Sequence, residues 1–161
     1  MNAMARVSIT PAPGGGVRVK LPKELRELLV SVAQQMRDLL TDDTYADSPM
    51  LARLFPPAAM DDPMAALGFE QLMGQAIHDG KIEAIGILEA TAGNDRLTEE
   101  ETLAWLRSIN DVRLMLGTHL QVDEDVDVET FMDDPATEHA AIVYVALTEL
   151  VDLLVRAVDP T

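Results

Sequence analysis

The chain has 161 residues, 48% of them hydrophobic, which suits a single domain with one core over residues 1–161. It contains no cysteine, so disulfides, thiolate catalysis and cysteine-bound metals are excluded. The net charge of −16 is uneven, with seven basic and six acidic residues in 1–53 (+1) but five and twenty-two in 54–161 (−17). Most of the molecule would therefore repel the phosphates of nucleic acids.

The sequence carries no sign of a membrane segment or of export. Its longest apolar run, Ala140–Leu147, is far shorter than the ~20 residues that span a bilayer. The N-terminus lacks the basic region and apolar core of a secretory signal. Since cysteine is absent as well, we expect a cytoplasmic protein that does not associate with membranes.

Residues 1–21 predict a small β-hairpin. Val7 and Ile9, and later Val17 and Val19, alternate with polar residues on either side of a loop rich in proline and glycine. Because an isolated hairpin is marginal in water, we expect it to lie on the helices that follow.

Five segments with helical spacing of apolar residues follow the hairpin, over 22–41, 48–55, 63–92, 98–119 and 135–158. Four of them have a proline in the first turn, where a missing N–H costs little, and Thr98 with Glu101 forms a capping box at the start of 98–119. The expected fold is mainly α: a compact helical bundle of about four to five helices with a small N-terminal β-hairpin.

Two of these helices have unusual compositions. Helix 63–92 contains glycines that each cost about 1 kcal/mol relative to alanine, which predicts close packing or a break near His78–Gly80. Helix 135–158 is apolar on nearly every side, which predicts a place in the middle of the bundle. The glycines are Gly68, Gly74, Gly80 and Gly86.

A helical wheel of residues 99–119 places Asn110, Arg113 and Gly117 inside an apolar arc. A guanidinium in such a place needs a carboxylate or several carbonyls, and the expected partners are Glu83 and Glu149. These five residues predict either a buried polar pair that fixes helix register or a site for a ligand or partner. The arc consists of Leu103, Leu106, Ile109, Leu114, Leu116 and Leu120.

Charged residues elsewhere form two groups. The only local basic cluster consists of Arg18, Lys20, Lys23 and Arg26, and any contact with nucleic acid is expected there, although an ordinary solvated surface is the alternative. On the last helix, Asp152 and Arg156 predict an i,i+4 ion pair on a solvated face.

The run Asp123–Glu129 spaces carboxylates like the start of an EF-hand loop. Val128 stands where that loop requires glycine, and Asp134 where it requires a bidentate glutamate, so we expect no calcium site. The three histidines lack zinc-site spacing, and Gly14–Gly16 is not followed by the Lys-Ser/Thr of a phosphate loop. No cofactor, metal or catalytic residue is expected.

Several motifs resemble the actinobacterial oxidative-stress regulator family (AosR), long catalogued as a domain of unknown function. The sequence Asn-Asp-x-Arg-Leu-x-Leu-Gly-Thr is the most specific of them, since it is unusual in a helix. The motifs are Arg53–Ala58, Asp61–Pro63, Leu103–Arg107, Asn110–Thr118 and Asp133–Pro135. The resemblance implies a helical regulator of transcription under oxidative stress, with dimerisation as a switch. Without cysteine, this chain cannot form the redox disulfide of a thiol sensor.

The sequence as a whole leads us to expect a non-enzymatic regulatory protein that acts through protein partners, among them the transcription machinery, and that can form a homodimer. Direct DNA binding through the N-terminal basic cluster is the first alternative. A small-molecule enzyme is the second.

Overall fold

The structure is a computed structural model that describes residues 7–41, 63–120, 135 and 137–159, with side chains described at 7–41, 77–117, 135 and 137–159. Its elements are α1 (Lys23–Thr41), α3 (Pro63–Thr91), α4 (Glu99–Leu120), α6 (Glu138–Val158), β1 (Ser8–Pro11), β2 (Val17–Lys20) and β3 (Arg96–Leu97). The expected mainly α fold is confirmed for these ranges, and the four helices lie within a few residues of their predicted bounds. The predicted helix 48–55 and the acidic run 123–134 lie outside the described residues.

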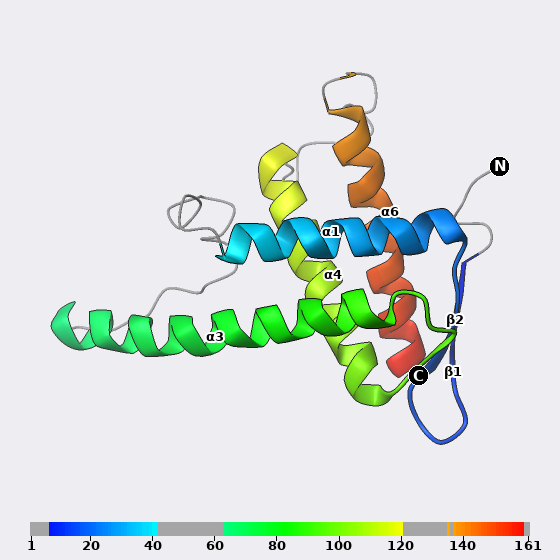
Figure 1. Ribbon diagram of the computed structural model, residues 1–161, viewed down its shortest axis with the longest axis horizontal. Helices are drawn as coiled ribbons and strands as arrows, with labels where there is room; N and C mark the ends of the chain where they lie inside the picture. Colours follow the sequence, from blue (N-terminus) through cyan, green and yellow to red (C-terminus); the bar gives the residue numbers. More distant parts are fainter. Residues whose placement is uncertain (1–6, 42–62, 121–134, 136, 160–161) are drawn as a thin grey trace.

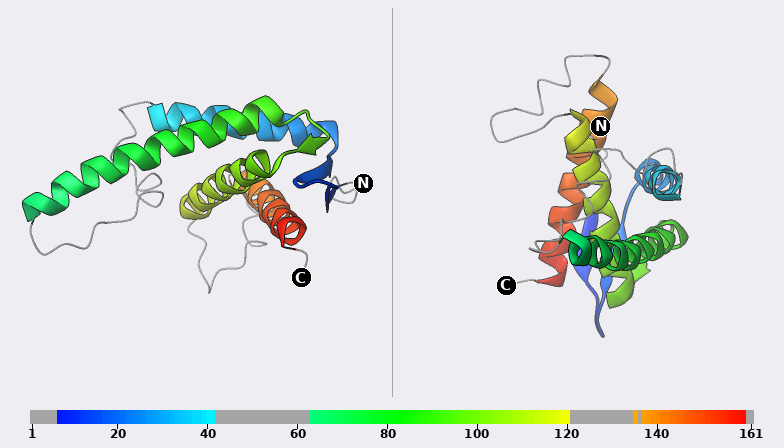
Figure 2. Two further views of the ribbon diagram at one scale, coloured as in Figure 1. Left: turned by 90° about the horizontal axis from the view of Figure 1, so that it is seen from below. Right: turned by 90° about the vertical axis from the view of Figure 1, so that its left-hand side faces the viewer.

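The helices form two layers. α1 and α3 run side by side in opposite directions, and they cross the pair formed by α4 and α6, which are also antiparallel (Figures 1 and 2). The small sheet lies at one end of both layers, beside the start of α1 and the end of α6. Each layer therefore covers one side of a shared apolar core.

The N-terminal hairpin gains a third strand that the sequence pattern did not predict. β1, β2 and β3 form an antiparallel sheet in which Thr10 pairs with Arg18 and Arg18 with Arg96. The backbone N–H of Val19 also donates to the carbonyl of Asp95 at 2.8 Å. β3 has only two residues, too few for an alternating pattern to be recognised in the sequence.

The loop between β1 and β2 depends on its glycines. Gly14, Gly15 and Gly16 have φ angles of 86°, 103° and 74°, values that residues other than glycine rarely adopt. Gly16 is also close to β3, since a Cβ there would collide with the carbonyl oxygen of Leu97. Glycine at this position therefore permits both the turn and the approach of the third strand.

Side chains from every element meet in one core. Trp105 is fully buried, and its indole N–H donates to the hydroxyl of Thr91 in α3 at 2.7 Å, while that hydroxyl donates to the carbonyl of Ile87. The indole thus keeps its hydrogen bond inside the core and links α4 to α3. The largest other side chains with less than 2% exposure are Leu29, Met36, Ile85, Leu88, Leu97, Ile109, Leu147, Leu150 and Leu154.

Helix α3 is continuous from Pro63 to Thr91, so the break expected near His78–Gly80 is wrong. Close packing does not explain Gly80 or Gly86 either. A Cβ on Gly80 would meet nothing within 4 Å, and one on Gly86 would meet only the Arg37 side chain at 3.9 Å. The helix tolerates both because the burial of side chains such as Ile85 and Leu88 on the same helix contributes more than the ~1 kcal/mol that each glycine costs.

Helix α6 does not lie in the middle of the bundle, contrary to expectation. It buries one face against α4 and β1, while Ile142, Val155 and Val158 are about half exposed, at 50%, 47% and 46%. Asp152 and Arg156 form the predicted ion pair at 3.0 Å on the outer face. The prediction was wrong because apolar residues surround nearly the whole helix, although only one side of α6 is buried.

Candidate functional site

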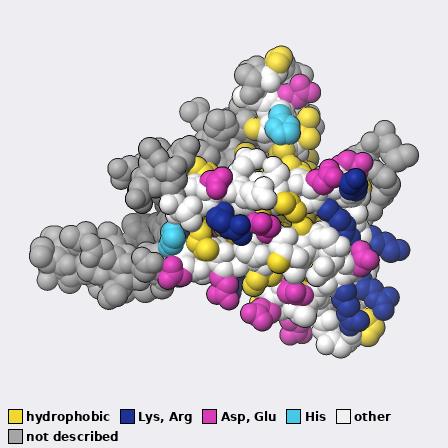
Figure 3. Space-filling view, in the orientation of Figure 1, with side chains coloured by type: hydrophobic (Ala, Val, Ile, Leu, Met, Phe, Trp, Pro, Cys, Tyr) yellow, Lys and Arg dark blue, Asp and Glu magenta, His cyan; other side chains and the backbone are white. Residues whose placement is uncertain are grey.

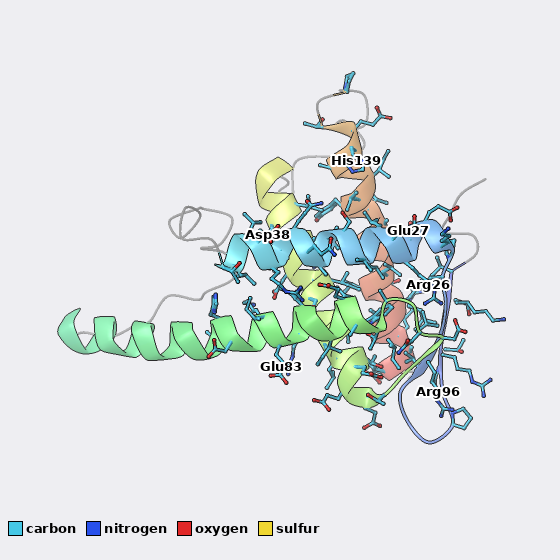
Figure 4. The ribbon with its side chains drawn as sticks, in the orientation of Figure 1. Arg26, Glu27, Asp38, Glu83, Arg96 and His139 are labelled. Atoms are coloured by element: carbon cyan, nitrogen blue, oxygen red, sulfur yellow. The ribbon has the colours of Figure 1, made fainter. Side chains whose placement is uncertain are left out.

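The polar residues predicted inside α4 do not form the expected ion pair. Arg113 is half buried, and its Nε and Nη2 donate to Oδ1 of Asn110 on the same helix at 3.2 and 2.7 Å. Glu83 and Glu149 are exposed, and neither lies within ion-pair distance of Arg113. Figure 4 shows Glu83 below α3, away from α1.

Gly117, the third of these residues, has a packing role. A Cβ at this position would lie 3.3 Å from Cε2 of Tyr144, so the glycine lets the tyrosine ring of α6 pack closely on α4. The five residues predicted as one polar site are therefore not brought together. Instead, Asn110 and Arg113 pair with each other, and Gly117 serves the contact between the two helices.

The helical wheel failed because it centred the buried face of α4 on leucines. Leu103 is 48% exposed, whereas Trp105, Ser108 and Asp111 are buried. Ser108 is accommodated because its hydroxyl donates to the Ala104 carbonyl one turn earlier at 2.7 Å. The true buried face therefore contains polar residues whose hydrogen bonds are satisfied locally or by a neighbouring helix, and apolar counting cannot detect such residues.

A largely buried ion pair lies between α3 and α4, and the sequence did not predict it. Lys81 Nζ donates to Asp111 Oδ2 at 2.9 Å, and their side chains are 17% and 12% exposed. Burial raises the pKa of the Asp111 carboxyl above its ordinary value, while the hydrogen bond and charge of Lys81 act in the opposite direction. The sequence gives no spacing that would relate the two residues, because they belong to different helices.

Arg26, one of the four basic residues proposed for nucleic-acid contact, is used inside the fold. Its guanidinium donates to the carbonyls of Leu21, Ala92 and Asn94 at 2.8–3.2 Å and to Asp95 Oδ1 at 3.1 Å. These contacts join the start of α1 to the chain between α3 and β3, at the place labelled in Figure 4. The side chain is only 17% exposed, so it is not available to a partner.

The other three basic residues of the cluster are exposed but differ in their partners. Lys23 lies 3.8 Å from Glu27 in an i,i+4 pair. Arg18 and Lys20 point outward from β2 and have neither an ion pair nor a side-chain hydrogen bond to any described residue. Arg96 of β3, which the sequence did not single out, lies beside Arg18. In Figure 3, basic side chains gather at the end of the molecule that carries the sheet.

The described histidines do not form a metal site. His78 Nε2 lies 2.6 Å from the carbonyl oxygen of Leu40, which ties α3 to the end of α1. His139 is exposed near the start of α6 (Figure 4). In the part of the chain that the structure describes, no three His, Asp or Glu side chains are placed to hold a metal ion.

An apolar groove is formed where α1, α4 and α6 meet. It has a volume of about 190 Å³ and opens to solvent. Ser31, Gln35 and His139 are the polar residues of its rim, and all three are exposed. The remaining lining residues are apolar: Leu28, Val32, Met36, Leu39, Val112, Met115, Leu116, Ala140 and Val143.

Some of the apolar residues that line the groove are accessible to an apolar group of a partner. Met36 and Met115 lie in its wall as core residues, 2% and 3% exposed, whereas Leu28, Leu39 and Leu116 are half buried and reach solvent. The width of the apolar stripe on α1 was the sequence signal for it. Leu28 and Leu39 widen that stripe, and in the structure both pack against the core while remaining only half buried.

The family model described as a domain of unknown function (DUF2017) matches residues 4–158, nearly the whole chain. The chain belongs to this family. No curated protein and no solved structure matches the chain significantly. Among the described helices, none combines the length and apolar character needed to cross a bilayer.

Proposed function

We propose that this protein is a non-enzymatic regulatory protein that binds a protein partner through the groove between α1, α4 and α6. The single observation that carries the proposal is an apolar groove open to solvent and edged by polar side chains. Accessible apolar surface of this kind is typical of sites that receive the apolar face of a partner helix.

The charge beside the groove indicates what the partner looks like. Glu27 and Asp38 are exposed on α1 (Figure 4), Glu27 about one turn before Ser31 and Asp38 about one turn after Gln35. A partner helix with apolar residues on one face and basic residues beside them would complement both the groove and these carboxylates. The net charge of −16 would also accelerate the approach of a basic partner.

The resemblance to the AosR family supplies the biological setting of the proposal. We propose that the partner belongs to the transcription machinery of an actinobacterium, as RNA polymerase or a sigma factor does, and that the regulation accompanies oxidative stress in the cytoplasm. Homodimerisation is part of the same proposal. Any response of this chain to oxidants proceeds without a thiol, because the sequence has no cysteine.

Direct DNA binding through the predicted cluster has less support. Arg26 is engaged by carbonyls inside the fold and Lys23 pairs with Glu27, which leaves only Arg18 and Lys20 of the original four. A basic surface on this scale is small for a nucleic-acid interface, in which affinity depends on many phosphate contacts.

Site-specific photo-crosslinking in the native cell tests the proposal. A photoreactive residue replaces Gln35 on the groove rim, and in a matched control it replaces Gln34, which is exposed on the same helix but does not line the groove. We expect position 35 to capture one protein that position 34 does not, and mass spectrometry identifies it. Identical capture at both positions, or none at either, would contradict binding through the groove.

The identity of the captured protein tests the biological setting separately. A component of the transcription machinery would support regulation of transcription, whereas a metabolic enzyme would contradict it while leaving the groove as a protein-binding site. Light scattering after size-exclusion chromatography measures the oligomeric state, and a monomer at all concentrations would contradict homodimerisation.

A further inference from the structure

The outer face of the sheet carries an arrangement of cations that the groove does not explain. Residues paired directly across antiparallel strands project from the same face, as do residues two apart on one strand. The register therefore places Thr10, Arg18 and Arg96 in one row across the sheet and Ser8 with Lys20 in the next. The opposite face carries Ile9, Val17, Val19 and Leu97, all of them buried in the core.

These cations stand side by side at an energetic cost. Like charges directly opposite each other on neighbouring strands destabilise a sheet by a few tenths of a kcal/mol to about 1 kcal/mol. Arg18 and Arg96 form such a pair, and Lys20 follows two residues after Arg18. The five residues on this face include no carboxylate, although the chain has 28 acidic residues.

The contacts of the three cations leave them able to bind an anion. Arg18 and Lys20 have no ion pair or side-chain hydrogen bond with any residue that the structure describes, and both are exposed. Arg96 donates one Nη2 hydrogen bond to the Pro13 carbonyl at 2.6 Å, which fixes its position beside Arg18. A guanidinium held in place by one hydrogen bond loses less conformational freedom when it binds a carboxylate.

We propose that this face, made of Arg18, Lys20 and Arg96 with the hydroxyls of Ser8 and Thr10, binds an extended acidic segment of a partner protein. Side chains two residues apart in an extended chain are about 6.7 Å apart, which is also the spacing of Arg18 and Lys20 along β2. Carboxylates at alternate positions of the segment would therefore meet successive cations. This site is separate from the groove, and it stands whether or not the proposed function is right.

An acidic protein segment fits this face better than a nucleic acid does. Proteins that bind nucleic acids tightly contact on the order of six to ten phosphates, while this face offers three cations. A long polyanion would extend beyond the sheet toward a molecule that carries −17 over residues 54–161. A short acidic segment ends within the face, so it avoids most of that repulsion, which screening limits to about 10 Å.

Isothermal titration calorimetry with the full chain tests the proposal. The probe is a synthetic peptide of about five residues in which Glu and Thr alternate, short enough to end within the face, and its control carries Gln in place of Glu, both at a salt concentration of about 50 mM. We expect the Glu peptide to bind and the Gln peptide not to bind. Equal binding of the two peptides, or no heat from the Glu peptide, would overturn the proposal.

Two single substitutions locate the site. Arg18→Gln removes a cation from the sheet, and Arg107→Gln removes an exposed cation from α4 that likewise has no described partner. We expect Arg18→Gln to weaken peptide binding about tenfold, the effect of one charge-assisted hydrogen-bonded contact, and Arg107→Gln to change it less than twofold. Equal effects of the two substitutions would show that only net charge matters and would reject the site.

A single-stranded oligonucleotide with the same number of charges as the peptide completes the comparison. Weaker binding of the oligonucleotide supports the acidic protein segment. Tighter binding, lost in Arg18→Gln and kept in Arg107→Gln, would overturn the proposal in favour of nucleic acid.

Discussion

At the level of single residues, Arg26 and Lys23 lie three positions apart on α1 and carry the same charge, but they have different structural roles. Arg26 donates hydrogen bonds to three carbonyls in two separate segments, whereas Lys23 makes one exposed ion pair at 3.8 Å. The planar guanidinium has five donors in a rigid fork that suits several fixed acceptors, whereas an ammonium has three donors on a flexible stem. The sequence shows the charges but not the carbonyls, which explains why both residues were assigned to one cluster.

Arg26→Lys should therefore lower the free energy of unfolding by about 1–3 kcal/mol, because it leaves partly buried carbonyls without a donor. The matched change Lys23→Arg should alter it by less than about 0.5 kcal/mol, since exposed ion pairs contribute little. Urea denaturation followed by circular dichroism measures both. A loss in Lys23→Arg as large as that in Arg26→Lys would contradict the structural role of Arg26.

The Lys81–Asp111 pair gives a prediction that depends on pH. Lys81→Met leaves the largely buried Asp111 carboxylate without its partner, which should cost about 3 kcal/mol at pH 7. Because burial raises the pKa of Asp111 above its unfolded value of 3.8, the folded state favours the protonated carboxyl. That contribution to stability is present below pH 3.8 and is lost as pH rises through the folded pKa.

The loss of unfolding free energy caused by Lys81→Met should accordingly shrink as pH falls from 7 toward 4, because protonation of Asp111 removes the unpaired charge. Urea denaturation of the variant and the native chain at several pH values measures this difference. Lys81→Met combined with Asp111→Asn is the control, and its deficit should vary little with pH. A deficit that grows on acidification would contradict the argument.

At the level of elements, the sheet depends on a loop that allows two strands to approach a third. Gly14 and Gly16 both have positive φ angles, but only Gly16 lies against the backbone of β3. The two glycines belong to one run of three, and nothing in that run shows which of them β3 will approach. The same holds for β3, whose two residues are recruited by Val17 and Arg18 of β2 and not by a pattern of their own.

Gly14→Ala and Gly16→Ala should therefore differ in stability. Alanine at position 14 has open space, so only the positive φ should cost about 1–2 kcal/mol. Alanine at position 16 adds a collision with the Leu97 carbonyl, and the loss should exceed that of Gly14→Ala by at least about 2 kcal/mol. Thermal unfolding of the two variants tests this order. Equal losses would show that the turn alone, and not the approach of β3, requires glycine.

At the level of the whole molecule, the net charge of −16 opposes compaction. Screening this repulsion should raise the midpoint of thermal unfolding by several degrees between about 20 and 500 mM sodium chloride. The exposed ion pairs lost to screening contribute too little to reverse this effect. Differential scanning calorimetry across that range measures the shift, and a falling midpoint would show that ion pairs outweigh the repulsion.

The sequence predicted the helices well because their apolar spacing, first-turn prolines and the Thr98–Glu101 capping box are local features. The box is present as predicted, with the Thr98 N–H donating to Glu101 Oε1 at 2.8 Å. What it could not predict depends on contacts between segments: the orientation of α4, the Lys81–Asp111 pair and the groove. Lys81 and Asp111 are 30 positions apart, and the groove is lined by three different helices, so no periodic pattern within one helix records these contacts.

The setting of Trp105 has a practical consequence. It is the chain's one tryptophan, it is fully shielded from water, and its indole N–H is bonded to Thr91 of a different helix. Its fluorescence should therefore peak at short wavelength in the native state and move to the red when α4 separates from α3. Intrinsic emission thus reports on this one junction without any label, and it can be recorded while a ligand is titrated onto a distant face.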